Sequence, residues 1–141
     1  MDLTSFLQRA RSALTLPVPN VPNGDLAAAT TAINTYYEAV EGMLVRFEQE
    51  LTVNDTFTLG RFGELTLAKG RRYTPTQVVA PGADAIALAE QHTLNKIVLD
   101  DANSQQNPAV VPYPTGGLSA ANTVRSGDTV VNLTGTVHYG F

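Results

Sequence analysis

The chain has 141 residues, a length that corresponds to one domain with an extra arm. It contains no cysteine, which excludes disulfides, thiolate zinc sites and a cysteine nucleophile. Its formal net charge of −4 gives no general attraction to DNA or to anionic membranes, because both require clustered positive charge. No stretch approaches the roughly 20 apolar residues of a membrane span. We therefore expect neither nucleic acid nor membrane among its partners.

The first 24 residues are predicted to form an arm. Residues 2–15 place apolar side chains on one face of a short helix, which needs a surface to lie on. The arm contacts that this predicts are Leu3, Phe6, Leu7 and Leu14. The following residues 16–24 contain Pro17, Pro19 and Pro22, a spacing that favours an extended and stiff link. The arm is thus tethered, and its surface belongs either to its own domain or to a neighbouring subunit.

Residues 25–51 carry an apolar repeat of seven residues. Leu26, Ile33, Val40 and Phe47 recur at this spacing, and Ala29, Tyr36 and Met43 fall three places after the first three. This is the a/d pattern of a helix whose apolar seam faces another helix. The pattern predicts one long amphipathic helix over 25–51, with an interface made of Leu26, Ile33, Tyr36, Val40, Met43 and Phe47. Two partners remain open for this seam: the β-rich part of the same chain, or the seams of other copies in a homotrimer.

Residues 52–141 are predicted to form a small, mainly antiparallel β-domain, either sandwich-like or barrel-like, because the apolar period changes to two. The expected elements are a hairpin with strands at 56–59 and 64–67, an extended segment at 72–79, and strands at 96–99 and 129–139. Residues 83–90 are compatible with a short helix or a strand, and residues 100–123 form a long loop. With the preceding helices, this gives an α+β fold.

No catalytic, cofactor or metal site is predicted. His92 and His138 lie far apart in the sequence, without carboxylates at metal-ligand spacing. Asp100, Asp101 and Asn103 offer oxygen ligands for calcium, but the glycine and late glutamate of an EF-hand loop are missing. We expect no cofactor and no small-molecule substrate.

One basic cluster stands out. It contains Arg61, Lys69, Arg71 and Arg72, beside the aromatic residues Phe62 and Tyr73. Basic residues between aromatic ones can follow a nucleic-acid backbone and stack on its bases. The plainer interpretation is a solvated end of the hairpin, or pairing with the acidic residues of a partner.

Three features of the organisation resemble a known class of proteins: the proline-tethered N-terminal helix, the heptad helix from Leu26 to Phe47, and the Thr/Val/Gly-rich end from Ser126 to Phe141. The chain resembles small structural virion proteins of tailed bacteriophages. The resemblance implies a non-enzymatic virion protein, assembled in the host cytoplasm, that stabilises a protein lattice. It implies either a trimeric capsid cement (decoration) protein bound to a major capsid protein, or a tail, fibre or spike connector.

Two other functions remain open. A carbohydrate-binding β-module would use exposed aromatic residues such as Tyr73, Tyr113 and Tyr139 as platforms for sugar rings. A hydrolase would need a carboxylate pair such as Asp84 and Glu90, which nothing in the sequence places together. We therefore expect a protein that is not an enzyme.

Overall fold

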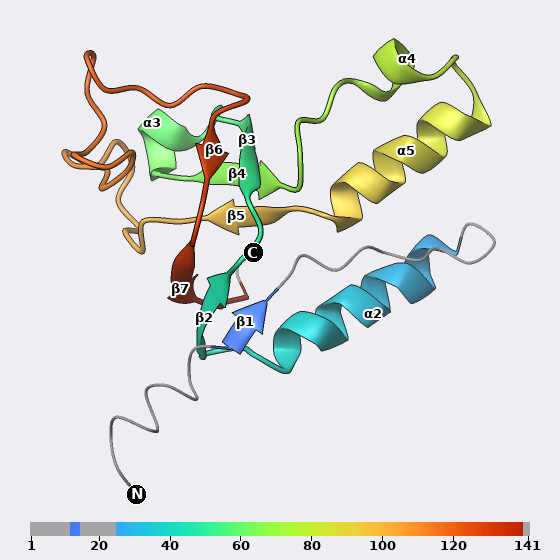
Figure 1. Cartoon of the computed structure of the whole chain (residues 1–141), viewed down its shortest axis with the longest axis horizontal. Helices are drawn as coiled ribbons and strands as arrows, with labels where there is room; N and C mark the ends of the chain where they lie inside the picture. Colours follow the sequence, from blue (N-terminus) through green and yellow to red (C-terminus); the bar gives the residue numbers. More distant parts are fainter. Residues whose placement is uncertain (1–11, 15–24, 140–141) are drawn as a thin grey trace, which may run out of the picture. The chain divides into compact units, whose positions relative to one another are not determined.

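The computed structural model describes residues 12–14 and 25–139 and has an α+β fold, in which helices accompany two small sheets (Figure 1). The chain divides into two compact units that alternate along the sequence. Unit 1 comprises Met1–Glu50, Thr74–Asn95 and Val131–Phe141, and unit 2 comprises Leu51–Tyr73 and Lys96–Val130. The predicted α+β class is confirmed.

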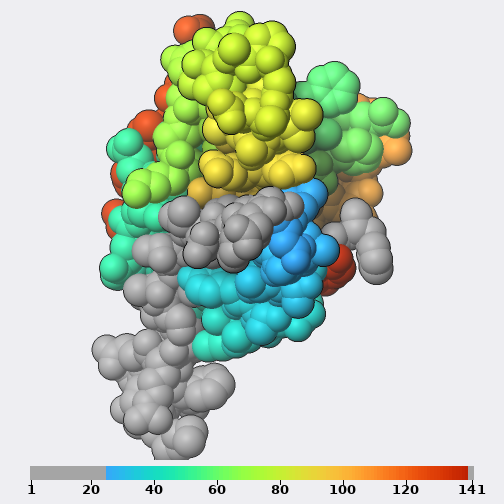
Figure 2. All heavy atoms as spheres, turned by 90° about the vertical axis from the view of Figure 1, so that its right-hand side faces the viewer, coloured from blue at the N-terminus to red at the C-terminus, as the bar shows by residue number. Residues whose placement is uncertain are grey.

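Unit 1 combines a three-stranded sheet with helices. Its elements are β1 (Ser12–Leu14), α2 (Leu26–Glu38), β2 (Leu44–Phe47), α4 (Pro75–Val78), α5 (Ala83–Leu94) and β7 (Thr134–Thr136). The strand order is β1-β2-β7, with β1 parallel and β7 antiparallel to β2. Helices α2 and α5 pack against each other and are both visible on the face shown in Figure 2. None of the helices in residues 25–139 is long and apolar enough to cross a membrane.

Helix α2 begins where the sequence predicts and ends much earlier. Asp25 is the N-cap, and its carboxylate Oδ1 accepts the backbone N–H of Ala28 at 3.0 Å. The helix ends at Glu38, and Gly42 then takes a φ of +74°, which is rare for residues other than glycine. The prediction of one helix over residues 25–51 is therefore wrong beyond Glu38.

The residues after Gly42 form strand β2 because their apolar side chains also fit a period of two. Val45 and Phe47 are buried, and Arg46 between them is exposed. The backbone N–H groups of Gly42 and Phe47 donate to the carbonyls of Val137 and Leu133, both at 2.8 Å. Pairing with the chain's last segment thus replaces the helical hydrogen bonds that a seven-residue repeat suggested.

The predicted helical arm is also corrected in part. Residues 12–14 form strand β1, in register with Val45, Arg46 and Phe47 of β2, so the helix prediction is wrong for these three residues, including Leu14. Backbone pairing with β2 replaces the helical bonds. The other predicted arm contacts, Leu3, Phe6 and Leu7, lie outside the described residues.

Unit 2 is built on an antiparallel sheet with the strand order β5-β4-β3-β6. Its elements are β3 (Leu51–Asp55), α3 (Leu59–Phe62), β4 (Leu65–Ala68), β5 (Ile97–Leu99) and β6 (Thr129–Val130). Most core side chains come from the strands, and Leu59 of α3 and Val111 of the long loop join them. Both sheets of the described chain are open.

Several predicted β-elements exist, but some of them lie at other residues than the sequence predicted. The hairpin exists, but its first strand is β3, and α3 occupies the place predicted for strand 56–59 and its turn. The strand at 96–99 is confirmed as β5. Two further segments are helical: Pro75–Val78, predicted as extended, and Ala83–Leu94, for which helix and strand had both remained open.

The predicted long strand over 129–139 is broken into β6 and β7. Asn132, between them, has a φ of +54°, which is outside the strand region. The two strands belong to different sheets, since β6 pairs with β3 and β7 pairs with β2. A uniform alternation of side chains cannot reveal such a change of pairing.

The loop from residue 100 to residue 128 is anchored within unit 2 by several contacts. The backbone N–H of Asn107 donates to the carbonyl of Arg61 at 2.7 Å, and the Tyr113 hydroxyl donates to the carbonyl of Leu99 at 3.3 Å. The Asp101 carboxylate packs directly on the Cα atom of Gly63 and accepts the backbone N–H of Asn103 at 2.9 Å. The loop therefore packs as part of unit 2. Asp101 can approach the backbone at position 63 this closely because glycine has no Cβ atom.

We expect Val53→Ala to lower the free energy of unfolding by about 2 kcal/mol, because it removes two buried methyl groups and leaves a cavity. Val53 is 1% exposed on β3, whereas Val98 on β5 of the same sheet is 55% exposed. Val98→Ala makes the same chemical change and should cost less than about 1 kcal/mol. Urea unfolding followed by circular dichroism measures both values. Equal losses at the two positions would contradict this assignment of the core.

We expect Gly63→Ala to be more destabilising than Gly70→Ala. The two glycines have nearly the same positive φ, +73° and +75°, so both substitutions carry a backbone cost of roughly 1–2 kcal/mol. A Cβ atom at position 63 would also overlap the Asp101 carboxylate, whereas at position 70 it would have nothing within 4 Å. Thermal unfolding in wild-type and Asp101→Ala backgrounds measures the extra cost, which should largely vanish when the carboxylate is removed. If the difference persisted there, the Asp101 contact would not be its cause.

Candidate interaction surface

Asn54 organises the most distinctive polar surface of unit 2. The pairing of β3 with β4 shifts register between Val53 and Asp55, so Asn54 occupies a β-bulge. Its amide Nδ2 donates to the carbonyls of Thr52 at 3.0 Å and Gly70 at 3.1 Å. Its Oδ1 accepts the backbone N–H of Arg72 at 2.7 Å. One side chain therefore fixes the course of the chain that leaves β4.

A tight turn at 125–128 reaches the same bulge. The turn is closed by two hydrogen bonds: Asp128 N–H donates to the Arg125 carbonyl at 3.0 Å, and Arg125 N–H donates to Asp128 Oδ2 at 2.8 Å. Val53 pairs with this turn through its backbone N–H and its carbonyl, both at 2.8 Å. The Ser126 hydroxyl also lies 3.5 Å from the Asn54 carbonyl. Two segments more than 50 residues apart thus meet at the bulge.

These two segments carry basic side chains. We call the group the basic knuckle, and its members are Lys69, Arg71, Arg72, Arg125 and the aromatic residue Tyr73. The Arg71 guanidinium lies over the Tyr73 ring, 5.3 Å from its centroid, and a Cβ atom placed on Gly127 would be 3.1 Å from Arg71 Nη1. Burial lowers the pKa of the half-buried Arg72, but arginine keeps its positive charge at neutral pH.

Three basic side chains of the basic knuckle lack an ion pair in the part of the chain that the structure describes, although the Asp128 carboxylate lies in the same turn as Arg125. Among the described residues, the side chains of Lys69, Arg71 and Arg125 form no ion pair with a carboxylate. Four of the nine basic residues of an acidic chain are gathered here. Unit 1, by contrast, has eight acidic residues and three basic ones in its sequence. The two units thus differ in charge, and unit 2 carries the concentrated positive surface described above.

The structure places the predicted basic cluster on two segments: Lys69, Arg71 and Arg72 follow β4, and Arg61 is on α3. Arg61 belongs to α3, where its guanidinium lies 5.0 Å from the centroid of the Phe62 ring and 3.4 Å from the Gln106 side-chain oxygen. Sequence analysis missed Arg125 and Asn54. Arg125 carries no local signal because its neighbours on the surface come from another part of the chain. Asn54 lies within β3, and its only signal in the sequence is a residue type that is disfavoured in strands.

The residues of the predicted helical seam do not lie on one helix. Leu26, Ile33 and Tyr36 are on α2, where Ile33 and Tyr36 are half-buried and the Tyr36 ring packs edge-to-face on Tyr37. Val40 lies in the turn after α2, and Met43 immediately precedes β2. Phe47 is 5% exposed on β2, in the core of its own unit. A continuous seam along residues 26–47 is therefore excluded.

The three tyrosines considered for sugar binding belong to different segments of the two units. Tyr113 is half-buried in unit 2, where burial and the neighbouring acidic side chains, Asp101 first, raise its pKa above the usual value for tyrosine. Tyr73 of the same unit lies under Arg71, and Tyr139 belongs to unit 1.

The remaining candidate groups are dispersed. Asp84 and Glu90 both lie on α5 but are six residues apart, so they point in directions about 120° apart around the helix. Within residues 12–14 and 25–139, no group of three or more histidine or carboxylate side chains is placed to hold a metal ion. In the Asp100–Asn103 loop, one oxygen of each side chain caps a local turn.

Comparison with known families identifies a matching domain family. Residues 11–141 match the family described as Domain of unknown function (DUF8508), and no curated protein or solved structure matches the chain. The matched region includes every element of both units and the whole basic knuckle. The chain therefore belongs to the DUF8508 family.

Proposed function

We propose that this chain is a non-enzymatic structural protein that binds neighbouring subunits of an assembled protein lattice, with the basic knuckle as a contact surface. The observation that carries the proposal is the local excess of positive charge on a chain with a net charge of −4. The Asn54 hydrogen bonds hold the backbone of this surface in place before any partner arrives. A fixed, charged surface without a reactive group suits recognition of another protein.

The complementary partner is an acidic protein surface. Exposed ion pairs contribute only about 0.2–1 kcal/mol each, so the knuckle of one molecule provides a weak contact. Weak contacts repeated over a closed lattice add up through avidity. Unit 1 of another copy, with its excess of acidic residues, has the charge that such a contact requires, and so does any acidic face of a shell protein.

In this proposal, the lattice is the virion of a tailed bacteriophage, most simply its capsid, on which the chain acts as a cement protein. The alternative is a tail, fibre or spike connector in the same kind of particle. The support for this setting is the resemblance in organisation, now reduced to the Thr/Val/Gly-rich end and the proline-rich segment 16–24, which lies outside the described residues. The predicted trimer has lost its main argument, because the seam residues are divided among α2, a turn and β2.

Electron microscopy of particles assembled with and without this chain tests the setting. We expect added density at many equivalent positions of the shell, and loss of particle stability when the chain is missing. Density confined to a few copies at the tail would favour the connector instead. If the chain added no density to the particles and made no difference to their stability, both locations would be contradicted.

We expect Arg71→Glu/Arg125→Glu to weaken rebinding to stripped particles by about tenfold or more, because it places negative charge opposite an acidic surface. Arg61→Glu/Lys96→Glu is the matched control, since it makes the same change in net charge at exposed positions of unit 2 outside the knuckle. Its effect should be less than about threefold. Co-sedimentation at low and high salt measures both, and the wild-type affinity should fall as salt rises.

Equal losses in the two variants would show that net charge, and not the knuckle, controls binding. A single-stranded oligonucleotide provides the other discriminating probe. If the wild-type chain bound it tightly and the knuckle variant did not, the surface would be a nucleic-acid site and the proposal would fail.

A further inference from the structure

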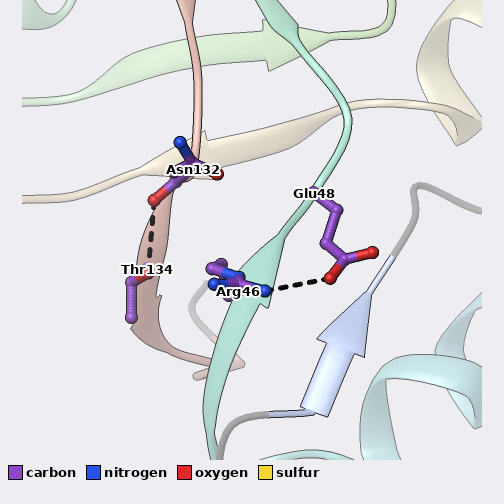
Figure 3. Close-up of polar contacts among 4 residues, drawn as sticks. All are labelled: Arg46, Glu48, Asn132 and Thr134. Carbon is purple, nitrogen blue, oxygen red and sulfur yellow. Dashed lines mark hydrogen bonds and ion pairs between the residues drawn. The ribbon is translucent and has the colours of Figure 1, made fainter.

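The described part of unit 1 carries far more carboxylates than cations. Its acidic residues are Asp25, Glu38, Glu41, Glu48, Glu50, Asp84 and Glu90, whereas Arg46 is the only lysine or arginine there. Figure 3 shows that the Arg46 guanidinium is already engaged, since its Nη2 lies 2.9 Å from Glu48 Oε1. Asn132 and Thr134, on the neighbouring segment in the same view, are uncharged. The other carboxylates of this part of unit 1 therefore have no lysine or arginine of their own unit to pair with.

The end of helix α2 carries two of these carboxylates, which we call the α2 end. Glu38 is the last residue of the helix, and Glu41 follows it in an exposed turn. The backbone N–H of Glu41 donates to the carbonyl of Glu38 at 3.3 Å, and such a turn brings the two Cα atoms within about 7 Å. Glu41 Oε1 lies 3.4 Å from the backbone N–H of Tyr139, which is a neutral neighbour. Two exposed negative charges thus lie close together.

The helix itself makes this an unfavourable place for negative charge. The C-terminal end of a helix has a partial negative charge from its unpaired carbonyl groups, so cations stabilise it and carboxylates do not. The last turn of α2 contains no basic residue, and neither Glu38 nor Glu41 forms an ion pair among the described residues. A cation from another molecule would therefore be bound favourably by both carboxylates and by the end of the helix.

The basic knuckle has the complementary arrangement. Arg71 Nη1 lies close to Gly127, two residues after Arg125, so guanidinium groups from two segments meet on one surface. Asp128, in the same turn, accepts the backbone N–H of Arg125 through its Oδ2. A guanidinium binds a carboxylate through two parallel hydrogen bonds, which makes the pair directional as well as attractive. Two guanidinium groups of the knuckle can thus match the two carboxylates of the α2 end.

We propose that the basic knuckle of one copy binds the α2 end of a second copy. The contact rests on the proposed function, because it names the partner of the same surface. Charge complementarity identifies this partner, since one chain supplies both the cations and the carboxylates that lack ion pairs among the described residues. The two surfaces differ, so the contact is heterologous and either repeats from copy to copy or closes into a ring. Neighbouring copies on a lattice would then bind each other as well as the lattice.

A carbodiimide tests this contact on the purified full-length chain, because it joins a lysine amine to a carboxylate that touches it. The chain has two lysines, Lys69 in the knuckle and Lys96 outside it. Unlabelled and nitrogen-15-labelled chains are mixed at low salt, cross-linked, digested and analysed by mass spectrometry. We expect isotopically mixed dimers in which Lys69 is joined to Glu38 or Glu41. Lys69→Arg keeps the charge but should abolish these cross-links, whereas the matched variant Lys96→Arg should leave them unchanged.

Neutralisation of the carboxylates provides the reciprocal test. Glu38→Gln/Glu41→Gln should lower the yield of mixed dimers by about fivefold or more, and the yield for the wild type should fall as salt rises. Asp84→Asn/Glu90→Gln is the matched control, because it removes the same charge from α5 of the same unit, and its effect should be less than about twofold. Thermal unfolding should show no loss of stability in the first variant, which removes negative charge from the end of a helix.

Three results would overturn the contact: Lys69 joined only to carboxylates of its own chain, mixed dimers joined through other carboxylates, or equal losses in the two neutralised variants. Absence of mixed dimers would overturn it as well. Rebinding to stripped particles separates the contact from the proposed function. If Arg71→Glu/Arg125→Glu rebound weakly while Glu38→Gln/Glu41→Gln behaved as the wild type in both assays, the knuckle would bind another acidic protein and only the contact between copies would fail. If mixed dimers formed as expected but both variants rebound normally, the contact would hold and its role in the lattice would fail.

Discussion

Strand β3 is the constraint on which unit 2 depends. It pairs with β4 on one side and with β6 on the other, and Leu51 and Val53 are almost completely buried. The one irregular residue in this strand, Asn54, has no regular place in the ladder, and its amide therefore binds the chain that leaves β4. The order of the sheet thus follows from the pairing of β3, and the position of the basic knuckle follows from the bulge at Asn54.

The structure explains why the first half of the predicted long helix was right. Asp25 caps the helix, and apolar residues recur at helical spacing after it, so local interactions and packing agree over residues 26–38. The second half failed because Val45 and Phe47 fit a strand as well as a heptad. Hydrogen bonds to residues 133–137, almost 90 positions later in the sequence, stabilise the strand instead of the helix. No window of local sequence contains that information.

The residues of the basic knuckle also differ in whether local sequence or distant pairing places them. The cluster of Lys69, Arg71 and Arg72 is visible in the sequence because its members are neighbours along the chain. Arg125 joins them only because Gly127 and Asp128 pair with Val53. Local charge patterns were thus sufficient to predict a basic surface. Its extent depended on the pairing of β6 with β3, which sequence periodicity does not specify.

The surface that we assign to binding derives from cationic side chains that form no ion pair within the part of the chain that the structure describes: Lys69, Arg71 and Arg125. Contacts made by these charges are screened within about 8 Å at physiological ionic strength, so binding through them depends on salt. Charged surfaces accelerate the encounter of subunits more than they slow their separation. Each such contact is therefore weak alone, and retention in a lattice depends on many of them acting together.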